Sequence, residues 1–162
     1  MSETREPKPG DVLAVNRGPY LHYAVYVGNG EVIHYRGRDG DFDGKITIHR
    51  APMSAFLRGN KEFSILQFPK EPPNPITLSE GIKKVLKGEA IQLFHQLRRE
   101  RNYHLYTPEE TVARAESRLG EESYHLLTDN CEHFAIWCKT GVSESHQVNA
   151  ILEGLEQRIL PW

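Results

Sequence analysis

Cysteine is scarce in this sequence. Only two of its 162 residues are cysteines, Cys131 and Cys138. If both lie in one helix they are about 10.5 Å apart along its axis, which is too far for a disulfide bond. We therefore expect reduced thiols and an intracellular, cytoplasmic protein.

Long apolar runs and blocks of like charge are also missing. No stretch approaches the ~18–20 apolar residues that span a bilayer, and residues 1–10 are polar, so no signal peptide is expected. The net charge is −2 without a basic block, which gives no indication of a nucleic-acid partner. An apolar content of 38% and a charged content of 26% are typical of a soluble globular protein.

A single domain is expected, because the length is typical of one domain and neither a linker nor an internal repeat is visible. We divide the chain into a flexible lead-in (1–9), a main domain (10–142) with a more helical segment around 69–106, and a C-terminal amphipathic segment (143–162). The β-branched and aromatic runs predict strands over 11–15, 20–27, 31–35, 45–49 and 62–68. Apolar spacing and capping residues predict helices over 52–57, 77–101, 107–120 and 130–141.

Two histidines lie in the clearest local pattern, a β-hairpin around Gly28-Asn29-Gly30. A two-residue Asn29-Gly30 turn places His34 opposite Val25 and puts His22 and His34 on different faces. A three-residue loop places His34 opposite Ala24 and puts both imidazoles on one face. Only the second register lets the histidines act together, and it is the one we predict.

Cys131 follows Asn130 at the predicted beginning of a helix. Free backbone N–H groups and the helix dipole stabilise an anion there, which favours a thiolate and indicates a nucleophile. The alternative is that Cys131 is an ordinary packed residue, because free cysteines are among the most buried side chains.

Two other stretches allow a binding role. The loop over 36–44 carries three alternating aspartates, but it lacks the final Glu and the flanking helices of a calcium-binding EF-hand, so we interpret it as a solvated loop. The stretch over 77–101 combines an apolar stripe with several lysines and arginines. Packing on the core is the favoured interpretation, and contact with a membrane surface or a partner is the alternative.

The residues His22–Gly30, Val32–His34, Leu126-Leu127 and Asn130–Phe134 together resemble the lecithin–retinol acyltransferase (LRAT) family. The similarity runs from about Pro9 to Gly141. It implies an α+β fold, with an antiparallel β-sheet packed against helices in a circularly permuted papain-like arrangement.

The resemblance also implies the roles of individual residues. Cys131 would be the nucleophile, His22 the general base and His34 the partner that orients His22. Tyr20 would support the oxyanion site, and Asn130 would stand beside the nucleophile. The hydrophobic C-terminal anchor of the animal members has no counterpart here, so a soluble member is expected.

We therefore predict a thiol-dependent acyltransferase or hydrolase that forms a thioacyl-cysteine from a phospholipid-type ester. Its partner would be an acyl-lipid, with peripheral membrane contact as an option and without nucleic acid, metal or cofactor. A cell-wall-type cysteine peptidase or amidase and a non-catalytic interaction module on the same fold are the alternatives. A zinc site formed by His22, His34, Cys131 and His133 is disfavoured, because no metal-binding spacing supports it.

Overall fold

An antiparallel sheet forms the centre of the molecule. The computed structural model describes residues 6–18, 20–37, 45–70, 78–91, 103–123, 130–142, 148, 151–153 and 155–161. The strands lie in the order β6-β4-β3-β2-β1-β5-β7, and all neighbours are antiparallel. Their bounds are β1 Val12–Asn16, β2 Leu21–Gly28, β3 Glu31–Gly37, β4 Ile46–Pro52, β5 Glu62–Gln67, β6 Glu122–Ser123 and β7 Glu156–Pro161.

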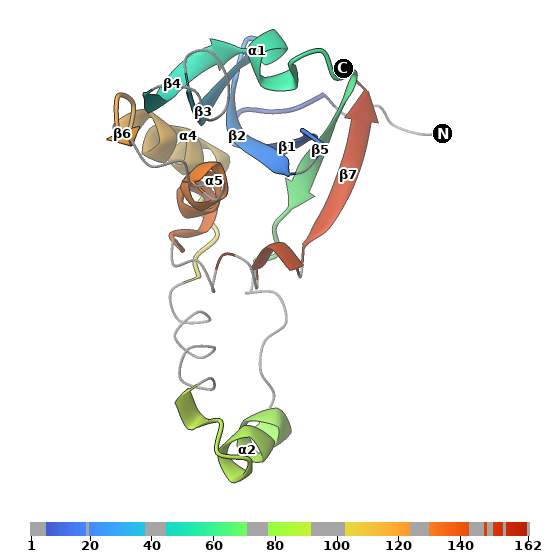
Figure 1. Cartoon of the computed structure of the whole chain (residues 1–162), viewed down its shortest axis with the longest axis vertical. Coiled ribbons are helices and arrows are strands. Elements are labelled where there is room, and N and C mark those ends of the chain that lie inside the picture. Colours follow the sequence, from blue (N-terminus) through green and yellow to red (C-terminus); the bar gives the residue numbers. More distant parts are fainter. Residues whose placement is uncertain are drawn as a thin grey trace.

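Helices pack on the sheet from two sides. The helices are α1 Met53–Leu57, α2 Leu78–Leu86, α4 Pro108–Ser117 and α5 Asn130–Thr140. α5 packs on β2 and β3 and beside α4, whereas α1 contacts β3 and β4 (Figure 1). α2 lies at the lower end of the molecule, apart from the sheet (Figure 1). The α+β prediction is thus confirmed.

Each face of the sheet has its own apolar cluster, because successive side chains of a strand alternate. Val12 and Ala14 of β1 belong to the cluster that includes α5, whereas Leu13 and Val15 belong to the cluster that includes α1. Both faces are therefore covered, which explains why β1, β2 and β3 consist of nearly continuous buried runs.

Local sequence signals account for the helix boundaries. Thr107 and Glu110 form a capping box at the beginning of α4, with Pro108 in its first turn. The box satisfies two backbone N–H groups that the helix leaves unpaired. The predicted helix over 130–141 is observed as α5. For the helix predicted over 77–101, the structure shows α2, which ends at Leu86, shortly before Gly88 with its φ of +76°. Residues 92–102 lie outside the described part of the chain.

The β2–β3 hairpin has the predicted register but not the predicted loop. His34 pairs with Ala24 and Val32 with Tyr26, whereas Glu31 pairs with Gly28. The turn therefore contains only Asn29 and Gly30, with φ angles of 54° and 72°, as a tight hairpin turn requires. Val27 is an extra residue in β2, and this β-bulge restores the register that we had assigned to a three-residue loop.

The amphipathic segment predicted over 143–162 contains a helical piece and a strand. Residues 151–153 are helical, but Glu156–Pro161 form β7, which pairs with β5 along its whole length. Leu160 is buried against the α1 cluster, whereas Ile159 is 67% exposed. Pairing with the edge of β5 thus gives part of this segment a strand conformation, with neighbouring residues on opposite faces.

Gly10 gives a direct test of how the beginning of the main domain packs against α4. Its φ is +94°, and a Cβ atom there would lie 2.5 Å from Cα of Pro108. We expect Gly10→Ala to lower the free energy of unfolding by roughly 3 kcal/mol, since left-handed strain costs about 1–2 kcal/mol and overpacking about 1–3 kcal/mol.

Gly120→Ala is the matched control for urea denaturation. Gly120 has a φ of +90° but no atom within 4 Å of an added Cβ. Gly120→Ala should therefore lower the free energy of unfolding only by the backbone strain of about 1–2 kcal/mol. Equal losses in the two variants would contradict the close contact between Gly10 and Pro108.

Candidate active site

Three histidines form a chain across three neighbouring strands. His22 of β2, His34 of β3 and His49 of β4 follow one another in the sheet. Nε2 of His22 lies 3.1 Å from Nδ1 of His34, and Nε2 of His34 lies 3.3 Å from Nε2 of His49. His22 and His34 are 1% and 0% exposed. The prediction that His22 and His34 share one face is confirmed.

The end of the chain determines where the protons are. Nδ1 of His49 lies 3.1 Å from the carbonyl oxygen of Thr47 and 3.2 Å from its hydroxyl oxygen. The carbonyl is the nearer partner and can only accept a hydrogen bond, so we assign a proton to this nitrogen. Nε2 of neutral His49 then accepts from Nε2–H of His34, and Nδ1 of His34 accepts from Nε2–H of His22. In this all-neutral arrangement the lone pair of His22 is on Nδ1, and that atom is the basic one.

The surroundings favour neutral imidazoles. Phe56 of α1 lies beside His22 and His34, with ring centroids 5.7 Å and 6.4 Å away. Burial lowers the pKa of His49 from its ordinary value of 6.5; its bond to Thr47 raises this pKa, and the Arg36 guanidinium lowers it. An apolar wall with a cation nearby therefore disfavours an imidazolium at this end of the chain.

Cys131 lies in the first turn of α5, as predicted. It is 5% exposed and belongs to the apolar cluster that includes Tyr23. The pKa of Tyr23 is raised by burial, then by the nearby Glu132 carboxylate and by Cys131. The thiol is therefore close to β2, at the residue next to His22 in the chain.

The structure thus joins the predicted site residues in two groups. His22 and Tyr23 leave β2 in opposite directions, as neighbouring strand residues do, so His22 packs on Phe56 while Tyr23 packs on the α5 side. His22 and His34 form one group, and Cys131 belongs to the other.

The two supporting residues occupy the ends of elements. Tyr20 is half-buried, and its carbonyl accepts a hydrogen bond from the backbone N–H of Arg17 in the turn before β2. Asn130 is the first residue of α5, and its side chain lies outside the described part of the structure.

Cys138 has a different environment from Cys131. Both thiols are free, but Cys138 is fully buried, and burial raises its pKa to about 12. A protonated thiol in the core is a poor nucleophile.

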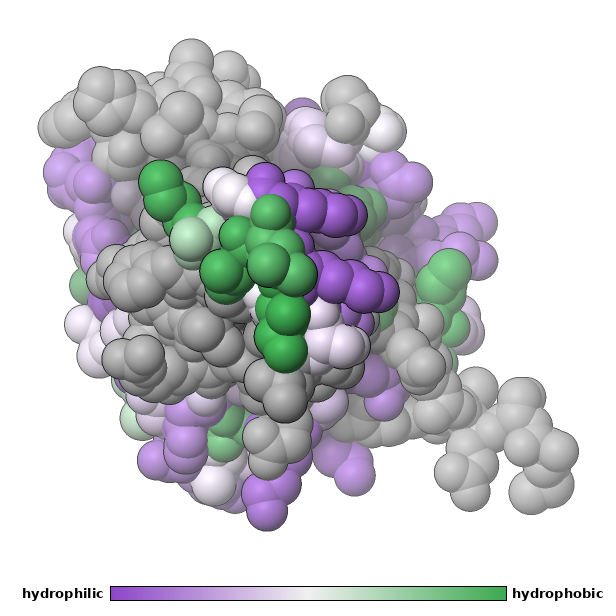
Figure 2. Space-filling view, turned by 90° about the horizontal axis from the view of Figure 1, so that it is seen from below, coloured by the Kyte–Doolittle hydropathy of each residue, from purple (hydrophilic) through white to green (hydrophobic). Residues whose placement is uncertain are grey.

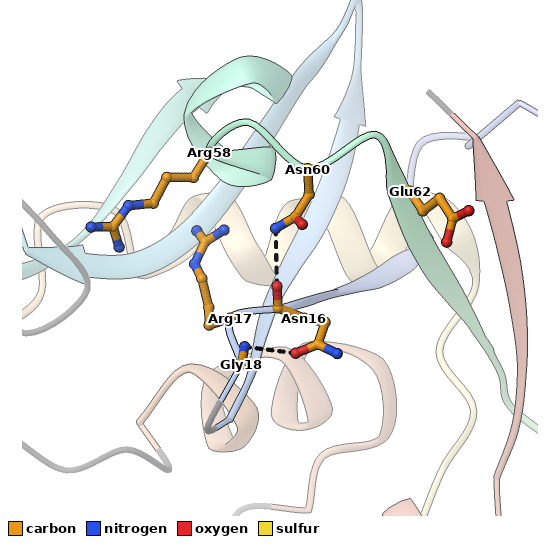
Figure 3. A pocket seen from close by; sticks show the side chains of 6 residues that line it. All are labelled: Asn16, Arg17, Gly18, Arg58, Asn60 and Glu62. Carbon is orange, nitrogen blue, oxygen red and sulfur yellow. Dashed lines mark hydrogen bonds between the residues drawn. The ribbon is translucent and has the colours of Figure 1, made fainter.

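A hollow of about 690 Å³ adjoins the turn between β1 and β2. Asn60 donates to the carbonyl of Asn16 and thus joins the two sides of the hollow, and the side chain of Asn16 accepts from the backbone N–H of Gly18 (Figure 3). Arg17 and Arg58 give it positive charge (Figure 3). Because Asn16 pairs with Leu21, the hollow is at the end of the sheet where His22 lies.

Neither metal ligands nor a membrane span is found in the described residues. His, Cys, Asp and Glu side chains in the part that the structure covers do not gather in a group of three or more suited to a metal ion. Within the same ranges no helix is long and apolar enough to cross a bilayer.

Sequence reasoning missed His49. The residue was assigned to a strand, and its strand is observed as β4, but facing His34 depends on how the loop after β3 sets the register of β4. That loop contains two Asp-Gly pairs, Asp39-Gly40 and Asp43-Gly44, and either could mark a turn, so the sequence left the register of β4 open. Thr47 and His49 are two residues apart and therefore lie on the same face of the strand, and this spacing was the only signal available.

These elements define an α+β protein that combines a buried histidine pair on β2 and β3 with a cysteine in the first turn of a packed helix. The lecithin retinol acyltransferase family model matches residues 5–144. The chain belongs to this family, whose members are enzymes.

Named relatives agree with this assignment. The chain is 32% identical to phospholipase A and acyltransferase 2 of Homo sapiens over 146 residues, covering 88% of this chain and 76% of that protein. It is 32% identical to phospholipase A and acyltransferase 3 of Mus musculus over 147 residues, with the same coverage. Identity to phospholipase A and acyltransferase 1 of Homo sapiens is 29% over 151 residues, covering 93% of this chain and 77% of that protein.

His49 should make the stability of the fold sensitive to acid. Its folded-state pKa lies below 6.5, so between these values the unfolded chain binds more protons than the folded chain. The contribution of neutral His49 to the free energy of unfolding is therefore present above pH 6.5 and is lost as the pH falls from 6.5 toward the lowered pKa. Thermal unfolding at about pH 7.5 and about pH 5.5 measures the loss.

His49→Gln is the comparison for this measurement. The amide does not titrate but can still accept from His34. We expect the melting temperature of the variant to fall less between the two pH values than that of the original protein. An equal loss in both proteins would contradict the neutral state assigned to folded His49.

Proposed function

We propose that the protein is a thiol-dependent acyltransferase and phospholipase A-type hydrolase acting on phospholipid-type esters. The observation that carries this proposal is the buried histidine chain, which leaves the basic lone pair on His22 Nδ1. Membership of the lecithin retinol acyltransferase family and the names of the relatives support the substrate class.

The first half of the reaction transfers the acyl group to Cys131. Nδ1 of His22 takes the thiol proton, and the thiolate attacks the ester carbonyl carbon. A C–S bond forms and the carbonyl oxygen becomes an oxyanion, which then re-forms the carbonyl as the C–O bond breaks. The proton on His22 goes to the departing alkoxide, so a lysophospholipid leaves as an alcohol.

The second half of the reaction releases the acyl group. His22 takes a proton from water, or from an amine or alcohol acceptor, which attacks the thioester carbonyl. The C–S bond breaks, and the proton returns to the Cys131 sulfur. Water as the acceptor gives hydrolysis and a free fatty acid, whereas another acceptor gives acyl transfer.

Charge development in these steps explains the other residues. The backbone N–H of Cys131, in the first turn of α5, is one of the helix-terminal donors that can stabilise the oxyanion, and Tyr20 and Asn130 are its proposed supporting residues. When His22 becomes an imidazolium, its Nε2–H bond to His34 strengthens. His49 holds the His34 tautomer in turn and is a positioning residue.

The step that needs the closest geometry is contact between the Cys131 sulfur and Nδ1 of His22. Hydrogen-bond reach is about 2.6–3.2 Å, and such contacts are commonly looser before substrate binds. α5 packs on the two strands that carry His22 and His34. The contacts described above join His22 to Phe56 and Cys131 to the cluster of Tyr23, so the proposal requires the Cys131 sulfur and His22 to come within this reach when substrate binds.

A peptidase or amidase acting through the same residues is the second candidate, and a non-catalytic module is the third. The relatives named phospholipase A and acyltransferase favour ester substrates over peptides. The buried histidine chain favours catalysis over a binding role, since perturbed titratable groups are typical of active sites.

Intact-mass spectrometry with phospholipid and with a short peptide tests the proposal. We expect an acyl adduct on Cys131 with phospholipid, and neither an adduct nor cleavage with peptide.

Cys131→Ala should abolish turnover. His22→Ala should lower it by about 10²–10⁴-fold, the usual contribution of a general base. His34→Gln should lower it by about 10–100-fold, as loss of an orienting partner does.

His104→Ala and Cys138→Ala are the controls, because His104 is exposed and Cys138 is buried in the core. Both should keep most of the activity. Full activity of His22→Ala would exclude it as the base, and cleavage of the peptide alone would favour the amidase.

A further inference from the structure

The helix α2 exposes an apolar face. Ile82 is 52% exposed, Val85 54% and Leu86 81%, and Ile91, which follows shortly after the helix, is 75% exposed. Figure 2 shows apolar side chains gathered at the end of the molecule where Figure 1 places α2. We call these four residues the α2 tip. So many large apolar side chains exposed together are typical of a binding surface.

Lysines border this face. At 100° per residue, Ile82, Val85 and Leu86 fall within about 100° of arc on α2. Lys83 lies about 60° beyond Leu86 on one side of that arc, and Lys84 lies about 100° beyond Val85 on the other side. Hydrophilic side chains lie directly beside the apolar ones in Figure 2.

The lysines have long enough side chains to reach past the apolar face. Lys83 and Lys87 are exposed, whereas Lys84 lies 3.9 Å from Glu89. Lysine ammonium groups can extend toward phosphates while their methylene stems cover apolar surface. The tip therefore combines apolar anchors with cations at their border.

The size of the surface argues against a second copy of this chain as the occupant. α2 has nine residues, so it is about 13.5 Å long. A stable protein interface buries about 800 Å² on each partner, from roughly 20–30 residues. Four side chains cannot supply that area, and pairing two tips would bring like charges together. A lipid interface needs no shape-matched partner and accepts a small apolar surface bordered by cations.

We propose that the α2 tip docks on the surface of an anionic phospholipid bilayer. The apolar side chains would enter the boundary between headgroups and acyl chains, and the lysines would contact lipid phosphates. The proposal goes beyond the catalytic assignment and rests on the proposed function only for its purpose, which is to hold the enzyme at its lipid substrate.

Vesicle co-sedimentation of the full chain tests the docking. Vesicles of phosphatidylcholine with phosphatidylserine are compared with phosphatidylcholine alone. We expect tighter binding to the anionic vesicles, weakening as salt is added. Val85→Ser/Leu86→Ser should weaken binding by about tenfold or more, because two apolar anchors are lost.

Matched variants separate the tip from general surface effects. Ile159→Ser changes a 67% exposed apolar residue on β7 and should leave binding unchanged. Lys83→Gln/Lys87→Gln should weaken binding to anionic vesicles only, whereas Lys61→Gln, an exposed lysine before β5, should not.

Hydrolysis of a soluble short-chain ester distinguishes docking from catalysis. The α2 variants should keep this activity while losing vesicle binding. Vesicle binding without ester hydrolysis would contradict the proposed function and leave docking supported. No binding by the original protein, unchanged binding by Val85→Ser/Leu86→Ser, or dimers in analytical ultracentrifugation that this variant abolishes would overturn the docking proposal.

Discussion

The extra residue Val27 in β2 determines on which face of the sheet His34 lies. Side chains alternate along a strand, so a shift of one residue moves every side chain of β3 to the other face. The Asn29-Gly30 turn alone would place His34 opposite Val25. The bulge changes this pairing to Ala24, and His34 meets His22 at 3.1 Å. The register of β4 then brings His49 opposite His34.

Burial gives this chain of histidines its chemical direction. A charged imidazole in an apolar site is costly, whereas neutral imidazoles can satisfy one another through alternating donors and acceptors. The carbonyl of Thr47 accepts at one end, so each ring donates toward it. The basic lone pair therefore emerges at the opposite end, on His22. The β-bulge, the strand register and the Thr47 carbonyl together determine that Nδ1 of His22 carries the basic lone pair.

The sequence predicted those features that depend on short-range signals. The helix that follows Thr107, the helix beginning at Asn130 and the common face of His22 and His34 were all predicted, since each follows from a few neighbouring residues. His49 and β7 were missed. The register of β4 and the pairing of β7 with β5 depend on contacts between segments far apart in the chain, which no local pattern encodes.

The reactivity of Cys131 as a function of pH tests the central claim most directly. The rate of iodoacetamide alkylation at each cysteine is followed by mass spectrometry in the original protein and in His22→Ala. We predict that Cys131 titrates below the ~8.5 of a free thiol, that His22→Ala raises this value, and that Cys138 stays unreactive until the protein unfolds. An alkylation profile of Cys131 that is the same in both proteins would contradict the pairing of Cys131 with His22.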